Sequence, residues 1–174
     1  MRWQLLDGID ELVPGRSVRA AARTDFPPEL FADHFPSFAV TPGVLLLEMM
    51  AQAAGLLVVA TRLDAEQRWV FPALSLVRDA KFRHFVPPST RLEIHAELES
   101  LHEHGAQCRG RVLAPRDDQT AEGTRRCASA RLVFAVGDGA TSATAGGDPT
   151  ALRGHLEGLF VDLESPWRPP GGAP

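Results

Sequence analysis

The sequence predicts an α+β domain in which an antiparallel β-sheet packs around one long buried helix. Three observations lead to this expectation. A nearly continuous apolar run extends from Val44 to Ala60, several later segments alternate apolar and polar residues, and short turn-forming stretches separate those segments. Alternation of this kind is typical of half-buried strands. With 174 residues, the chain is long enough for one such domain with a short extension.

The apolar run predicts the central helix, from about Pro42 to about Leu63. Thr41 is a candidate N-cap, and Pro42 suits the first helical position because a proline there loses no helical hydrogen bond. The run is shorter than the roughly 20 apolar residues that a membrane span requires, and Glu48 and Gln52 interrupt it. We therefore expect a helix buried on every side in a globular core, with no membrane span.

Five segments predict the strands, namely residues 17–24, 68–83, 90–101, 107–114 and 125–136. Pro72 in the second segment indicates a sheet edge or a bend, since proline donates no ladder hydrogen bond. The faces expected to point into the core are Leu92, Ile94, Ala96 and Leu98; Cys108, Gly110 and Val112; and Ala128, Ala130, Leu132, Phe134 and Val136.

The composition changes after this domain, which we expect to cover residues 1–136. Residues 137–148 are rich in Gly, Ala, Ser and Thr and predict a flexible linker. Residues 149–165 predict a short amphipathic helix, and residues 166–174 a disordered tail. An isolated helix of this length is marginal in water, so its apolar stripe should be buried on the sheet or on a partner subunit. The stripe comprises Leu152, Leu156, Leu159, Phe160 and Leu163.

Composition also narrows the function classes. The net charge of −4 gives no indication of nucleic-acid binding. The two cysteines, Cys108 and Cys127, form no metal or redox motif and are too few for a disulfide framework. Acidic residues occupy the N-terminal segment where a signal peptide would need an apolar core. We therefore expect a cytoplasmic protein.

The stretch from His34 to Gln52, "HFPSFAVTPGVLLLEMMAQ", resembles the active-site segment of the β-hydroxyacyl-acyl-carrier-protein dehydratases (FabZ type), which have the hotdog fold. It has the His-Phe-Pro and Pro-Gly-Val-Leu elements of that family, and Glu48 follows His34 by 14 residues. The similarity extends from Phe31 to Val136. The loop residues Ser37–Ala39 stand where the family usually has Gly and Pro, and the family's His-Arg-Tyr-Pro-Phe opening is missing, as in a divergent member.

The resemblance implies removal of water from a 3-hydroxyacyl thioester. His34 is then the base that takes the C2 proton, because a neutral imidazole is available near pH 7. The N–H of Gly43, at the helix start, would stabilise the thioester oxygen. Glu48 would protonate the leaving hydroxyl, since apolar surroundings favour a protonated carboxyl. Gln52, four residues on, would orient Glu48. The reaction implies no metal and no organic cofactor.

The resemblance also suggests contacts and partners. Phe35 and Val44 are candidates for binding the acyl chain. Phe82 and Phe85 are expected mainly in the core, with lining of an acyl tunnel as the alternative. In this family two hotdogs pair into one sheet and share their sites, which implies a homodimer. The substrate would arrive on an acidic acyl carrier protein or on coenzyme A. Candidate carrier contacts, or else a merely solvated surface, are Arg78, Lys81, Arg83, Arg125 and Arg126.

Three other functions fit the same fold. A hotdog acyl thioesterase would use an acid on the helix but would not need His34. A non-catalytic partner subunit would keep the fold without the loop geometry. An enoyl-CoA hydratase would run the same reaction in reverse. The sequence leaves open the acyl chain length, the carrier and the pathway, whether fatty acid, polyketide or another lipid.

Overall fold

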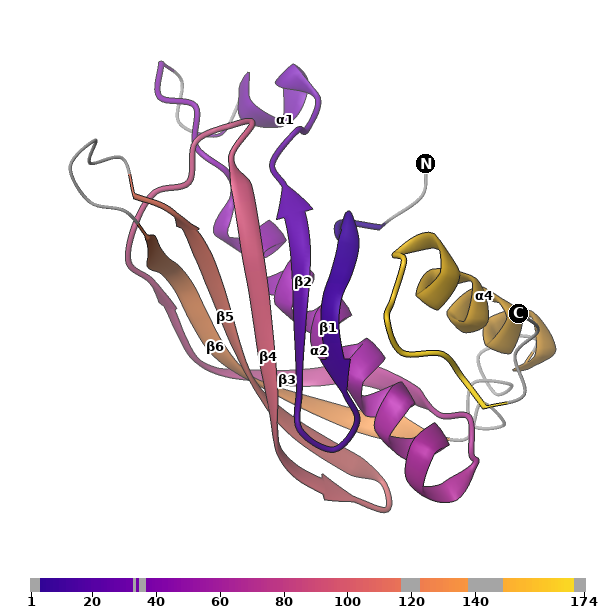
Figure 1. Ribbon diagram of the computed structural model, residues 1–174. Coiled ribbons are helices and arrows are strands. Elements are labelled where there is room, and N and C mark those ends of the chain that lie inside the picture. The colour runs from indigo at the N-terminus through magenta and orange to yellow at the C-terminus, as the bar shows by residue number, and fades with distance from the viewer. Residues whose placement is uncertain (1–3, 33, 35–36, 117–122, 138–148, 171–174) are drawn as a thin grey trace.

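The computed structural model describes residues 4–32, 34, 37–116, 123–137 and 149–170. Its six strands form one antiparallel sheet in the order β1-β2-β4-β5-β6-β3, and the long helix α2 lies against one face of that sheet (Figure 1). This arrangement confirms the expected α+β fold. The elements are β1 (Gly8–Val13), β2 (Ser17–Arg23), α1 (Pro28–Ala32), α2 (Gly43–Glu66), β3 (Phe71–Phe82), β4 (Arg91–His102), β5 (Gly105–Pro115), β6 (Thr124–Gly137) and α4 (Pro149–Asp162).

The five predicted strands are present, with bounds that differ by at most three residues from those expected. The sequence analysis missed β1, although Ile9 and Leu12 are buried there. The pairing of β1 with β2 shifts register between Ile9 and Glu11. The irregularity separates the two apolar residues by three positions, so the alternation that marks a strand is absent from the sequence.

The core lies between α2 and the inner face of the sheet. The predicted inner faces of β5 and β6 are buried, and so are Leu92, Ile94 and Ala96 of β4, whereas Leu98 is only partly buried. Gly110 of β5 permits close packing, because a Cβ at this position would lie only 2.8 Å from the Met50 sulfur. The helix therefore approaches the sheet most closely where β5 has no side chain.

The start of α2 differs from the prediction. Pro42 has an extended ψ of 131° and precedes the helix, which begins at Gly43 with no side-chain cap. The Thr41 hydroxyl instead lies 3.5 Å from the Pro87 carbonyl oxygen, so Thr41 as N-cap was wrong. The helix continues to Glu66, three residues beyond the expected end.

One side of α2 is not closed over by the sheet, which corrects the expectation of a helix buried on every side. Val44 is 68% exposed, and Leu47, Glu48, Gln52 and Gly55 are only partly buried. Helix α2 is long and apolar enough to cross a membrane, but 67% of its most apolar window is buried inside the domain. It is therefore the core helix, with one incompletely covered stripe.

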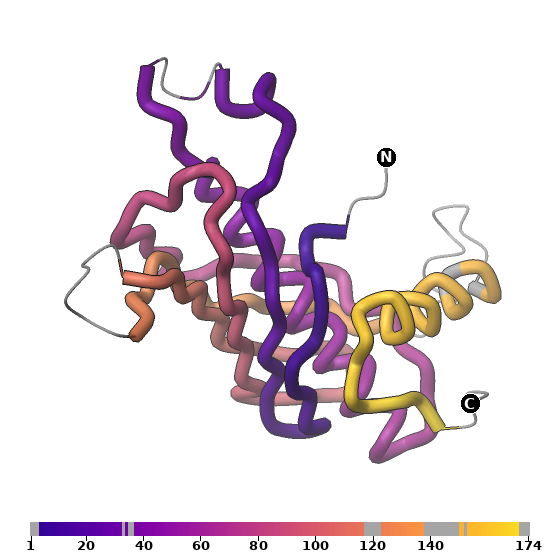
Figure 2. The backbone as a smooth tube through the Cα atoms, turned by 45° about the horizontal axis from the view of Figure 1, so that its top comes forward, coloured from indigo at the N-terminus to yellow at the C-terminus, as the bar shows by residue number. Residues whose placement is uncertain are grey.

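Helix α4 packs beside β1 and α2, as Figures 1 and 2 both show. Leu156, Phe160 and Leu163 of its apolar stripe are buried, and Leu159 is partly buried. Beyond the helix, the backbone N–H of Ile9 in β1 donates to the Leu163 carbonyl at 2.8 Å. The stripe thus covers the chain's own core. The side chain of Leu152 and residues 138–148, the expected linker, lie outside the described part.

The segment after α4 also differs from the prediction. The helix ends at Asp162 rather than at residue 165. The Trp167 ring packs edge-on against Phe160 with centroids 5.1 Å apart, and Arg168 donates to the Phe160 carbonyl at 2.9 Å. Disorder from residue 166 onward is therefore wrong for these residues. An aromatic contact and a hydrogen bond to the same residue, Phe160, hold this segment, and such contacts leave no periodic signal in the sequence.

Candidate active site

His34 lies on the loop that connects α1 to α2. Its backbone N–H donates to the Phe31 carbonyl at 3.2 Å, which extends the turn of α1, and its side chain is partly buried. Phe35, the candidate acyl contact beside it, lies outside the described residues. Ser37 has φ of 71°, the left-handed conformation that glycine adopts without penalty. The chain therefore holds a serine in this conformation, at a cost of about 1 kcal/mol.

Gly43 is the first residue of α2, so its N–H has no carbonyl partner within the helix. A Cβ on this residue would lie 2.8 Å from a ring carbon of Phe82 at the end of β3. Only glycine lets the Phe82 ring pack directly on the helix start. The N–H expected to polarise the thioester thus stands at an aromatic wall, with the positive end of the helix dipole behind it.

Glu48 and Gln52 form one hydrogen-bonded unit on the open side of α2. The Gln52 side-chain amide donates from Nε2 to Glu48 Oε1 at 3.0 Å. Its Oε1 accepts the backbone N–H of Leu5 at 2.9 Å. The N-terminal segment therefore fixes the Gln52 amide, and the amide in turn fixes one oxygen of the carboxyl. A carboxyl that is held on one oxygen keeps the other for a substrate.

A pocket of about 410 Å³ lies beside this carboxyl, within the usual size range of small-molecule sites. We call it the α4 pocket, and it is bounded by α2, the first part of β3 and α4. Its described polar lining is confined to four side chains, and the remaining lining is apolar. His34 is not among the described residues that line it. The polar residues are Gln4, Glu48, Gln52 and His155.

A second pocket, of about 450 Å³, lies beside the loop and the end of β3. We call it the aromatic pocket. Phe82 and Phe85 line it and are 52% and 67% exposed, so their expected place in the core was wrong. They lie at or just beyond the end of β3, which is an outer strand of the sheet among the described residues. Phe38 stacks edge-on with Phe85 at 5.4 Å. The rest of the lining is Arg83, His84, Pro87 and Arg125.

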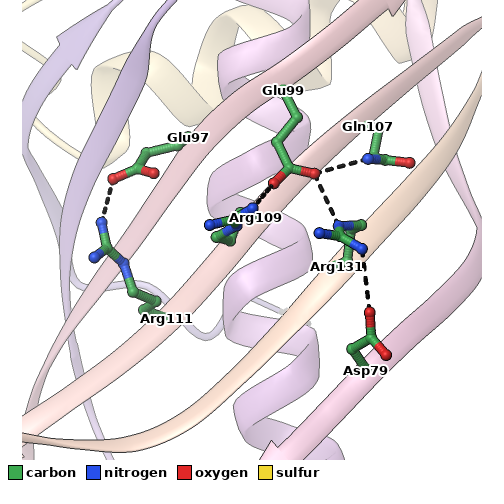
Figure 3. A network of polar contacts seen from close by, with 7 residues as sticks. All are labelled: Asp79, Glu97, Glu99, Gln107, Arg109, Arg111 and Arg131. Atoms are coloured by element: carbon green, nitrogen blue, oxygen red, sulfur yellow. Dashed lines mark hydrogen bonds and ion pairs between the residues drawn. The ribbon is translucent and has the colours of Figure 1, made fainter.

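Three of the basic residues singled out from the sequence, Lys81, Arg83 and Arg126, line a shallow depression of about 380 Å³ on the outer face of the sheet. A polar network occupies the same face (Figure 3). Glu99 lies at its centre and accepts from Gln107 at 2.7 Å and from Arg131 at 2.9 Å. Arg109 also pairs with Glu99, and Arg131 pairs in turn with Asp79, whereas Glu97 and Arg111 form a separate ion pair beside this network.

The environment of Glu99 shifts its acidity. Partial burial by itself raises the pKa of this carboxyl, but the hydrogen bond from Gln107 and the Arg109 and Arg131 guanidinium groups outweigh it and hold the pKa below its ordinary range. The network therefore neutralises part of the positive charge on the outer face. Arg78 and Arg125 lie outside this depression, and Arg125 lines the aromatic pocket instead.

A comparison with known protein families shows to which family this chain is related. The family model described as the FabA-like domain matches residues 2–121, well over half of the chain. The chain belongs to the FabA-like family. The match includes the loop with His34, the start of α2 and the Glu48–Gln52 pair. It ends before β6 and α4, so the helix that bounds the α4 pocket lies outside the matched residues of this FabA-like chain.

Relatives of the FabA-like chain include two proteins named 3-hydroxyacyl-acyl-carrier-protein dehydratase FabZ. The one from Lactobacillus helveticus is 33% identical over 135 residues, covering 76% of this chain and 82% of the relative. The one from Pediococcus pentosaceus is 38% identical over 93 residues, covering 53% of this chain and 60% of the relative. Several such alignments, including the Pediococcus one, span less than two thirds of the relative's length.

Solved structures place the FabA-like chain among hotdog folds. A chain of a dehydratase heterocomplex from Xenorhabdus doucetiae superposes with a TM-score of 0.62 at 16% identity, covering 83% of this chain and 90% of that one. A Streptococcus mutans protein bound to acetyl-CoA superposes with a TM-score of 0.56 at 12% identity, covering 79% and 93%. The shared architecture confirms the hotdog fold.

Two parts of the site were missed from the sequence. The Leu5 N–H that fixes Gln52 is a backbone group, and backbone groups carry no sequence signal. The α4 side chains that line the pocket belong to a stripe that the sequence does reveal, but its docking surface depends on the way β1 and α2 come together. The regularly spaced leucines therefore indicated that one face of the helix is buried, but they did not indicate the surface on which it packs.

Proposed function

We propose that this protein is a hydro-lyase that removes water from a (3R)-hydroxyacyl thioester and gives the trans-2-enoyl thioester. The observation that carries the proposal is the Glu48–Gln52 pair at the edge of an apolar pocket, in a chain of the FabA-like family. A carboxyl held on one oxygen beside an apolar pocket suits the delivery of one proton to a leaving group. The FabZ relatives carry the name of the same reaction.

In the proposed reaction the His34 imidazole takes the proton from C2. The electron pair of the broken C2–H bond then forms the C2=C3 double bond as the C3–O bond breaks. Glu48 gives its proton to the departing hydroxyl, which leaves as water. The Gly43 N–H stabilises the negative charge that develops on the thioester oxygen. The site then holds a protonated histidine and an ionised glutamate, and proton exchange with water restores both. No cofactor takes part.

We propose further that two chains share each site in a homodimer. His34 does not line the pocket that holds Glu48, which fits a site completed by the loop of a partner subunit. The free edge of β3 supports such pairing, because a row of large apolar side chains is exposed along it and around the loop. These are Phe38, Val44, Leu74, Leu76, Phe82 and Phe85.

The substrate is proposed to arrive on an acyl carrier protein or on coenzyme A, in fatty acid, polyketide or related lipid biosynthesis in the cytoplasm. Arg83 supports this because it lines both the aromatic pocket and the outer depression. Val44, Phe82 and Phe85 are the proposed walls for the thioester arm at the mouth of the site. A cationic rim around an apolar entrance suits an anionic carrier with an acyl cargo.

The test is an assay of the purified protein with 3-hydroxyacyl thioesters on both carriers, following the enoyl product. His34→Ala and Glu48→Gln should each lower turnover by a factor of about 100 or more, with the fold and the dimer intact. His104→Ala and Glu103→Gln are matched controls, because both side chains are exposed, and should leave turnover unchanged. Normal dehydration by either site variant contradicts the assignment.

Mixing the two inactive variants tests the shared site. A hybrid dimer contains one site with both His34 and Glu48, so activity should return after subunit exchange. If exchange is demonstrated and no activity returns, each chain builds its own site. Release of free thiol in place of the enoyl product, unaffected by His34→Ala, would identify a thioesterase instead. Inactivity of the homodimer on every thioester would favour a non-catalytic partner subunit.

A further inference from the structure

Helix α4 forms one complete side of the pocket beside Glu48. Leu156 and Leu159 of α4, together with Leu163 directly after the helix, contribute apolar lining, and His155 contributes the polar lining from α4. The opposite side is formed by α2 and the first part of β3. Figure 2 shows α4 extending across the open side of α2, next to β1. The pocket would be an open groove without this helix.

The helix is fixed at both ends. At its C-terminal end, the Ile9 N–H donates to the Leu163 carbonyl at 2.8 Å, and Phe160 is fully buried. Toward its N-terminal end, the Arg153 guanidinium lies over the Trp69 ring, 5.4 Å from its centroid. Trp69 lies two residues before the start of β3, and β1 and β3 are the two outer strands of the sheet. Helix α4 therefore bridges the gap between the two edges of the sheet.

The polarity of the pocket changes along α2. Glu48 and Gln52 provide the polar groups on this helix, whereas Ala51 and Gly55 present almost no side chain to the pocket. The small residues leave free volume between α2 and α4. An aliphatic chain attached to a carbon that reacts at Glu48 has apolar room in this direction, and Leu159 of α4 faces the same space.

We propose that α4 is the wall that limits the length of the acyl chain, with Leu159 as the residue that the chain end meets. This inference rests on the proposed function, since it assigns the acyl subsite of that same site. Leu156 and Leu163 are almost completely buried, whereas Leu159 is only partly buried against the core. Leu159 can therefore change in size without unfolding the helix, which makes it the adjustable part of the wall.

Gly55 offers an independent test from the opposite side of the pocket. A Cβ on this residue would meet only the Pro72 ring, at 3.6 Å, which is ordinary van der Waals contact. Alanine also favours a helix interior over glycine. Gly55→Ala should therefore fold normally and make the pocket narrower, whereas Leu159→Ala makes it wider and Leu159→Trp makes it shallower.

The experiment measures kcat/KM for 3-hydroxyacyl-pantetheine thioesters of increasing chain length. For the first chain that the unmodified protein handles poorly, Leu159→Ala should raise kcat/KM by about tenfold. Leu159→Trp and Gly55→Ala should lower kcat/KM by a similar factor for the longest chain that is normally accepted. All variants should keep their activity on the shortest substrate. Val161→Ala changes an exposed residue of the same helix and should leave the whole profile unchanged.

A binding measurement separates this inference from the proposed reaction. Saturated acyl-pantetheine amides of the same chain lengths, which cannot be dehydrated, are titrated into each variant by calorimetry. The unmodified protein could turn over no thioester while the Leu159 variants still bind amides of a different preferred length. In that case the proposed function fails, but the role of α4 in limiting the acyl chain is supported. An unchanged length preference in the folded Leu159→Ala, Leu159→Trp and Gly55→Ala variants overturns the wall, whatever the protein catalyses.

Discussion

Two apolar surfaces lie beside α2, and they differ in what covers them. The surface around Glu48 and Gly55 is covered by α4 of the same chain. The surface that follows β3 and the loop before α2 is uncovered, with Val44, Phe82 and Phe85 more than half exposed. Both contain residues of the proposed site. A large apolar patch at a sheet edge indicates an interface, so the contrast suggests that the chain closes the acyl end of its site and leaves the reacting end to a partner.

The two surfaces also differ in whether the family match includes them. The uncovered surface belongs to residues 2–121, which match the FabA-like domain, whereas α4 lies outside them. The following four substitutions test whether the two surfaces differ in what covers them.

The largest effect is expected from Leu76→Arg on the uncovered edge. Leu76 is an exposed residue of β3, and pairing of two β3 edges would bury the new charges without partners. The penalty should be about 3 kcal/mol or more, which weakens the dimer over 100-fold. Analytical ultracentrifugation measures the change. Val161→Arg, the same change at an exposed site on α4, is the control, and a Leu76→Arg dimer of unchanged affinity would contradict pairing through β3.

On the covered surface, Phe160→Ala should lower the free energy of unfolding by about 3–5 kcal/mol, because a fully buried phenylalanine is removed from the contact with Trp167. The adjacent Val161→Ala should change it by less than about 0.5 kcal/mol, since Val161 is 63% exposed. Urea denaturation measures both. Similar values for the two variants would show that α4 does not hold the surface closed.

A smaller effect is expected at the Glu48 carboxyl, on the covered surface. Gln52→Ala removes the amide that links Glu48 to the Leu5 backbone, so the carboxyl should lose its orientation. We expect kcat to fall roughly 10-fold to 100-fold with little change in KM. Gln107→Ala removes an amide from a glutamate on the outer face instead and should leave kcat unchanged. A rise in KM alone would assign Gln52 to substrate binding.

The smallest effect concerns Glu99, which belongs to neither surface. Its pKa is lowered in the folded protein, so its stabilising contribution is present above the ordinary carboxyl pKa of about 4.3 and is lost as the pH falls through the folded value. The difference in unfolding free energy between the unmodified protein and Glu99→Gln should therefore be largest near neutral pH and should shrink as the pH falls into the acid range. A free-energy difference that grows as the pH falls would contradict the lowered pKa of Glu99.

The fold class, the central helix and the positions of the five strands predicted along the chain followed from the sequence alone, and so did the choice of residues for the proposed chemistry. Those features are local: the period of apolar residues predicts helix or strand, and the Pro-Gly step and the spacing of His34 and Glu48 lie within one segment. The stripe on α4 was visible for the same reason. Even the expected burial of that stripe followed from the weakness of an isolated helix in water.

Which surfaces are covered depends on how the elements assemble in three dimensions. The sequence alone suggested that Phe82 and Phe85 would be buried, because apolar side chains usually are, but β3 is an outer strand of the sheet in the described part of the chain, and both rings are more than half exposed there. The support of Gln52 by the Leu5 backbone and the closure of the pocket by α4 join segments far apart in the sequence. Such contacts depend on which strands end up at the edges, and that is a property of the assembled sheet rather than of any single segment.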